Sequence, residues 1–225
     1  MKSYLLLYTL LVLVTNSVAF TGKEDSANVS GGSLTIGLVR DNYNGFYTLG
    51  IGQYNLNKKS GICVYGLLRS LQFGLGPTFN LFDSKIVLIP MLGLAYGRKF
   101  SGNDHPIIGD AWIPSLILKS TFEQWFFDLT SFYYIPLRGA KKIGAEYLWY
   151  WFNGGIALSK VIKVGLHIES LRLIKSKAEP AGALYFWVGP TISLNFSEHA
   201  SFRLSGGKDL KAFEYLKLDF IFLID

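Results

Sequence analysis

Hydrophobic and polar residues alternate along short segments of this chain, and the pattern is clearest near its end. The five even positions from 216 to 224 are all leucine, phenylalanine or isoleucine, whereas Lys217 and Asp219 stand between them. A period of two places these two sets on opposite faces of a β-strand. The segment therefore predicts a strand with one apolar face and one charged face.

Similar segments recur along the chain and predict twelve strands. An even number lets the strands of an antiparallel barrel begin and end on the same side, with short turns at one end and longer loops at the other. If 61–82 is instead one long strand, a ten-stranded barrel is the alternative. The predicted strands are 33–41, 46–56, 61–69, 71–82, 85–97, 111–120, 125–136, 146–159, 161–173, 182–196, 200–209 and 213–224.

Composition indicates where the apolar faces point. Half of the residues are hydrophobic and 16% are aromatic, with 24 glycines besides. The predicted mature chain contains no clean apolar run of about 18 residues, the length that a membrane helix needs. A closed β-barrel is the other structure that satisfies its backbone hydrogen bonds in lipid. We therefore predict an all-β fold, a transmembrane antiparallel up-and-down barrel.

The beginning of the chain resembles an export signal. Lys2 precedes an apolar run, and Ser17, Val18 and Ala19 suit cleavage after Ala19. We expect a signal peptide over residues 1–19, a flexible periplasmic lead-in over 20–32 and the barrel over 33–225. The single cysteine, Cys63, excludes an intrachain disulfide.

Alternation also assigns faces within each strand. Prolines at 90, 114, 136 and 190 are expected at bulges or strand ends, because proline lacks the N–H donor. The residues expected to face lipid are Leu34, Ile36, Leu38, Leu49, Ile51, Phe73, Leu75, Phe79, Leu81, Leu88, Leu92, Leu94, Val164, Leu166, Ile168, Leu184, Phe186, Val188, Ile192 and Leu194. Uncharged residues expected in the lumen are Thr35, Thr48, Gln72, Thr78, Asn80, Thr191, Ser193, Asn195 and Ser205.

The export signal, the repeated alternation, turns such as Phe82-Asp83-Ser84-Lys85 and the amphipathic last strand resemble the small bacterial outer-membrane β-barrel proteins. The resemblance implies the outer membrane of a Gram-negative bacterium as the location. It implies lipid and lipopolysaccharide as surroundings and the barrel-assembly machinery as a partner. It is architectural and leaves the activity open.

Charged residues of both signs are expected in the lumen. They predict a narrow passive pore, porin-like, or a structural barrel whose lumen is filled by side chains. An outer-membrane lipid or peptide hydrolase is the alternative, because Glu169 could orient His167. No nucleophile is placed beside that pair by sequence, so we do not predict an enzyme. The charged lumen candidates are Lys119, Asp128, Lys163, His167, Glu169, Arg203, Lys217 and Asp219.

The expected outer loops carry a basic patch that would meet lipid phosphates or steer anionic solutes. No nucleic-acid module accompanies it. Asp104, His105 and Asp110 fit an ordinary solvated loop, and no metal or cofactor is predicted. Aromatic residues at 133, 134, 149, 150 and 151 are expected to form an interfacial girdle. The basic patch consists of Arg138, Lys141, Lys142, Arg172, Lys175 and Lys177.

Overall fold

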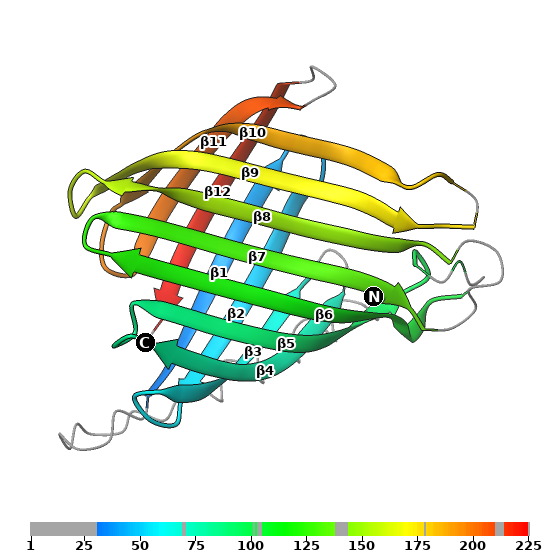
Figure 1. The fold of residues 1–225 in the computed structure, drawn as a ribbon, viewed down its shortest axis with the longest axis horizontal. Helices are drawn as coiled ribbons and strands as arrows, with labels where there is room; N and C mark the ends of the chain where they lie inside the picture. Colours follow the sequence, from blue (N-terminus) through cyan, green and yellow to red (C-terminus); the bar gives the residue numbers. More distant parts are fainter. Residues whose placement is uncertain are drawn as a thin grey trace, which may run out of the picture.

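The computed structural model of the chain describes residues 31–68, 71–100, 102, 105–137, 144–177, 179–209 and 214–224. These residues form one closed antiparallel β-barrel, whose strands run obliquely across one another in the near and far walls of Figure 1. Within the described ranges, no helix is long and apolar enough to cross a membrane. The prediction of an all-β barrel is confirmed.

The barrel has twelve strands in sequence order around the ring, as the alternation predicted. Most bounds lie within two residues of the expected ones, and β6 begins four residues earlier. The strands are β1 (Gly31–Asp41), β2 (Gly45–Asn55), β3 (Ser60–Leu67), β4 (Gln72–Leu81), β5 (Ile86–Gly97), β6 (Ile107–Phe122), β7 (Trp125–Pro136), β8 (Glu146–Ala157), β9 (Ile162–Lys175), β10 (Gly182–Asn195), β11 (Ala200–Asp209) and β12 (Glu214–Ile224).

The first and last strands close the ring. β1 pairs antiparallel with β12, with Leu38 opposite Phe220. Every strand therefore has a neighbour on both sides, and closure removes the exposed sheet edge that lipid cannot tolerate. The ten-strand alternative is wrong, because the chain reverses between β3 and β4. There the N–H of Leu71, a residue with φ of 43°, donates to the carbonyl of Leu68 over 3.3 Å.

The two ends of the barrel differ in their connections. The connections at one end, the turn end, are tight: 56–59, 82–85, 123–124, 158–161 and 196–199. At the β2–β3 turn, the side-chain oxygen of Asn57 accepts from the N–H groups of Lys59 and Ser60 at 2.8 and 2.9 Å. The opposite end, the loop end, carries the longer connections, including 98–106 and 137–145.

Prolines do not all lie where alternation placed them. Pro136 ends β7 as expected, but Pro90, Pro114 and Pro190 lie inside strands. The register shifts lie elsewhere, at Ala95/Tyr96, Glu146/Tyr147 and Ala183/Tyr185. Beside each internal proline, pairing with one neighbouring strand is interrupted without a change of register. On β4, a side chain on Gly76, which the register places opposite Met91, would collide with the carbonyl of Pro90, so glycine is required there.

The outward face of the barrel is apolar. In β4 the exposed residues alternate with buried ones, and Leu75 is 63% exposed. An apolar band of this kind is costly in water and suits the hydrocarbon of a bilayer. Leu34 lies on this face by its pairing with Ile224, although it is buried. Other large side chains exposed on this face are Ile62, Val64, Phe73, Phe79, Leu81, Leu92, Leu166, Val188, Ile192, Leu216, Phe220, Phe222 and Ile224.

Three face assignments in β2 and one in β10 are wrong. Leu49 and Ile51 pack against the interior apolar cluster, and Thr48 pairs with the outward-facing Leu38. Alternation within β2 was correct, but its large residues fill the lumen because part of the interior is itself apolar. Leu184 lies at the bulge in β10 and lines a cavity at the loop end instead of facing lipid.

Candidate functional site in the barrel interior

A buried carboxylate joins four strands in the lumen. Glu169 of β9 has no solvent exposure, and one of its oxygens accepts from Trp149 Nε1 and from the Tyr185 hydroxyl, each over 2.9 Å. Its other oxygen lies 2.6 Å from Lys217 Nζ of β12 and 3.3 Å from His167 Nε2. A buried charge is tolerated when it is paired and hydrogen-bonded, and Glu169 meets both conditions.

His167 extends this network to the next strand. Its Nδ1 lies 2.7 Å from Oδ1 of Asn153, the residue opposite it on β8. Three buried polar atoms around it, Asn153 Nδ2, Tyr215 Oη and Asp219 Oδ1, have no hydrogen-bond partner among the residues that the structure describes. Buried polar groups of this kind are commonly satisfied by internal water. The polar half of the lumen therefore has the chemistry to hold water.

The remaining charged candidates lie nearer the turn end and also point inward. Arg203 of β11 reaches across to Asp128 of β7, with 3.6 Å between nitrogen and oxygen. Lys119 stands opposite Asp128 on the neighbouring strand. The ammonium of Lys163 lies 5.5 Å from the centre of the Phe126 ring. All eight charged lumen candidates therefore lie on the inward face.

Aromatic side chains from facing walls of the barrel meet in the lumen, toward the loop end. β2 and β8 are diametrically opposite in the ring, yet the ring centroids of Tyr47 and Trp149 are only 6.1 Å apart. Tyr65 of β3 and Phe132 of β7 meet at 5.3 Å. Lys217 lies 5.3 Å from the Trp151 ring. Contacts across the barrel at these distances leave no wide passage between the residues that make them.

This interior corrects the predicted aromatic girdle. Tyr134 and Trp149 are buried, and Trp151 packs against the same interior cluster. Tyr133 and Tyr150 lie on the opposite, outward face by alternation. Adjacent aromatic residues in one strand cannot all face lipid, because successive side chains point to opposite sides.

A cavity of about 580 Å³ opens at the loop end, above the closed layer. Trp149 and Tyr185, which hold Glu169, also line this cavity. The other lining residues are Tyr43, Asn44, Tyr47, Leu67, Lys99, Phe100, Tyr134, Tyr147, Leu171 and Leu184.

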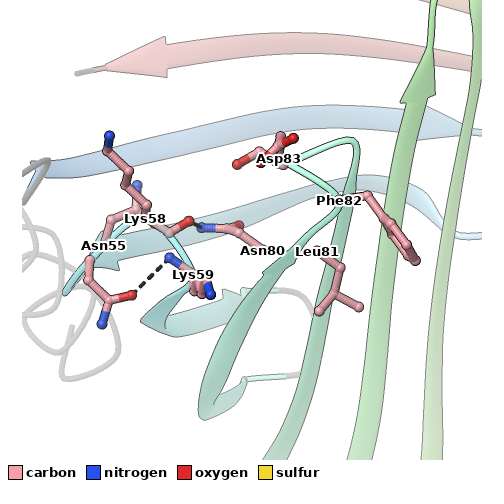
Figure 2. A pocket seen from close by; sticks show the side chains of 9 residues that line it. Asn55, Lys58, Lys59, Asn80, Leu81, Phe82 and Asp83 are labelled. Carbon is pink, nitrogen blue, oxygen red and sulfur yellow. Dashed lines mark hydrogen bonds between the residues drawn. The ribbon is translucent and has the colours of Figure 1, made fainter.

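A second hollow, of about 700 Å³, lies at the turn end between the β2–β3 and β4–β5 turns (Figure 2). Figure 2 shows Phe82 pointing away from Asn80 and Lys59. Main-chain and side-chain groups of Asn80 bond to the carbonyls of Lys59 and Lys58, which ties the two turns together.

The loop candidates are only partly described. Arg172, Lys175 and Lys177 are exposed at the loop end, and Lys175 lies 3.7 Å from Glu146. Arg138, Lys141, Lys142 and Asp104 lie outside the described residues. His105 is exposed, whereas Asp110 is buried and accepts the N–H of Phe100 over 3.0 Å.

The described residues do not assemble the geometry of a hydrolase around His167. Ser170 lies on the face of β9 opposite to His167, and its hydroxyl donates to the Tyr185 carbonyl. His167 itself is 1% exposed, so a substrate has no access to its ring. In the described part of the chain, no three His, Cys, Asp or Glu residues are grouped to hold a metal ion.

Sequence reasoning missed Trp149 and Tyr185 as partners of Glu169, and it missed Asn153 as the partner of His167. Tyr185 had a usable signal, because it alternates with Phe186 and Val188, which were assigned to the lipid face. Asn153 had none, since the pairing of β8 with β9 that brings it to His167 is not local.

The comparison with solved structures confirms the resemblance to outer-membrane barrels. An outer membrane channel from Pseudomonas putida F1 has a TM-score of 0.52 at 11% identity, covering 90% of this chain and 98% of that one. The outer membrane channel DcaP of Acinetobacter baumannii has a TM-score of 0.45 at 7% identity, covering 86% of this chain and 72% of that one. The KdgM porin has a TM-score of 0.47 at 10% identity, covering 84% of this chain and 98% of that one. At this identity the similarity to the first channel concerns the fold alone.

Among curated proteins nothing matches this sequence. A family described as a family of unknown function, DUF6733, matches residues 1–223. Because this match spans nearly the whole sequence, the chain belongs to the DUF6733 family.

Proposed function

We propose that this protein is a narrow passive pore of the bacterial outer membrane, closed by a layer of aromatic rings in the conformation described. The observation that carries the proposal is the contact of Tyr47 with Trp149 between opposite walls of the barrel. A polar, charged interior on the turn side and a cavity on the loop side are the two vestibules of a pore. The layer between them sets its width.

The alternative function, a hydrolase at His167, has less support. A general base must reach the proton that it takes up, and this requires access to the substrate. His167 is enclosed by Glu169, Asn153 and Tyr215, and Ser170 points away from it. The same enclosure suits a structural plug of the lumen.

Conductance of the refolded protein in planar bilayers tests the pore. We expect small, infrequent openings for the wild type and larger, longer ones for Tyr47→Ala/Trp149→Ala, because truncation of both rings opens the closed layer. Tyr150→Ala, on the outward face beside Trp149, is the matched control and should behave as the wild type does. No conductance from the double variant would identify a structural barrel. Wide wild-type conductance that the double variant leaves unchanged would place the passage elsewhere.

We also propose that outer-membrane lipid and lipopolysaccharide surround the barrel and that the barrel-assembly machinery inserts it. The exposed apolar face of β4 and the exposed cations Arg172, Lys175 and Lys177 at the loop end support the lipid contact. Cations at that level can meet the phosphates of an anionic leaflet. Nothing in this arrangement favours nucleic acid as a partner.

Orientation in the membrane gives a direct prediction. In a Cys63→Ala background, His105→Cys at the loop end should react with an impermeant thiol reagent on intact cells. Ser84→Cys at the turn end should react only after the outer membrane is permeabilised, because short turns face the periplasm in such barrels. Labelling of Ser84→Cys alone on intact cells would reverse the orientation.

A further inference from the structure

The cavity at the loop end has the composition of a binding site for a small molecule. Its volume of about 580 Å³ lies in the range of ligand pockets, roughly 300–1,000 Å³. Ligand pockets are mostly apolar and aromatic, with a few polar groups that orient the ligand. Seven of its twelve lining residues are aromatic, and Asn44, Lys99 and the tyrosine hydroxyls supply polar groups.

The aromatic walls are held in place by contacts with one another and with Asp110. The Phe100 ring stacks on Tyr134 at 4.7 Å with an interplanar angle of 9°, and the Phe100 N–H is fixed by Asp110. Tyr43 packs edge-on against Tyr185 at 4.4 Å. Walls already ordered lose little freedom when a ligand binds, which favours affinity.

The lining also indicates the chemistry of the occupant. Planar rings associate by offset stacking or edge-to-face contact, and such pairs contribute beyond the area that they bury. The cavity offers both aromatic faces and edges from β2, β7, β8, β10 and the β5–β6 loop. In the β1–β2 turn, desolvation and the nearby Asp209 carboxylate raise the pKa of the Tyr43 hydroxyl, so this side chain is uncharged at neutral pH.

We propose that the loop-end cavity binds a small planar aromatic molecule against Trp149 and the stacked pair of Phe100 and Tyr134. This goes beyond the pore proposal, because binding in the cavity requires no passage through the lumen. Trp149 connects the cavity with the lumen, since it lines the cavity, contacts Tyr47 and donates to Glu169. A ring that occupies the cavity therefore rests on the residue that closes the lumen.

Tryptophan fluorescence of the refolded protein in detergent tests the site. The probe is 4-nitrobenzyl alcohol, a planar aromatic quencher. We expect saturable quenching. Trp149→Phe should abolish it, and Phe100→Ala should lower the affinity for the probe by about tenfold or more. Trp112→Phe is the matched control: Trp112 lies on the outward face of β6 and is exposed, so its loss should leave the saturable component intact.

Competition then defines the chemical class. Benzyl alcohol should displace the probe, whereas cyclohexylmethanol, of similar size but not planar, should compete at least tenfold more weakly. Quenching that rises linearly with probe in every variant would overturn the proposal, because it would report partition into detergent. Equal competition by cyclohexylmethanol, or competition by glucose alone, would also overturn it. Binding without any conductance would leave this site standing while the pore proposal fails.

Discussion

Glu169→Gln is expected to destabilise the folded barrel by about 3–5 kcal/mol, the usual cost of removing one partner from a buried ion pair. The loss would leave the ammonium of Lys217, itself almost fully buried, without the carboxylate 2.6 Å away. The glutamine amide can still accept from Trp149 and Tyr185, so the effect isolates the missing charge. Denaturant unfolding of the protein refolded into lipid vesicles measures it.

Two further variants serve as controls for Glu169→Gln. Glu146→Gln removes a carboxylate whose partner, Lys175, is 76% exposed, and it should cost no more than about 1 kcal/mol. Glu169→Gln/Lys217→Met should regain much of the stability, because no unpaired charge then remains buried. Equal losses for Glu169→Gln and Glu146→Gln would contradict the buried network.

Any current that Glu169→Gln still carries should shift toward anions, since a negative charge is removed from a poorly screened passage.

Leu75→Arg is expected to cost about 2–4 kcal/mol, the penalty for a cation at the bilayer midplane on the lipid face of a barrel. Leu75 lies in the middle of β4, is 63% exposed and pairs with Val64 and Leu92, which also face outward. An arginine there would have only lipid and apolar side chains around it. The same vesicle-based unfolding measurement applies.

The matched control is Leu81→Arg. Leu81 shares the strand and the outward face with Leu75 but ends the strand at the turn end, near the membrane interface. Its cost should fall to about 0–1 kcal/mol, since an arginine at that level reaches water and headgroups. Equal costs at both positions would be incompatible with the apolar face of β4 lying across a bilayer.

Strand number and most faces could be read from the sequence because alternation is a local property. In β4, Phe73, Leu75 and Phe79 face outward and Gln72 and Thr78 face inward, as the period of two predicted. Local reasoning was insufficient where both faces are apolar. Leu49 and Ile51 of β2 face a lumen that is itself partly hydrophobic, so their size gave no information about direction.

In the candidate site, too, part of the arrangement follows from local alternation and part from the tertiary structure. Alternation placed Glu169, His167 and Lys217 on inward faces, which is a statement about each strand alone. The contacts that give them a role join β8, β9, β10 and β12, and they depend on the register and closure of the whole ring. Likewise, Tyr47 and Trp149 are about a hundred residues apart and meet only because the barrel brings opposite walls within reach of two rings. The sequence by itself predicted a twelve-stranded barrel with charged residues inside, and only the tertiary structure decided that aromatic rings from opposite walls meet there.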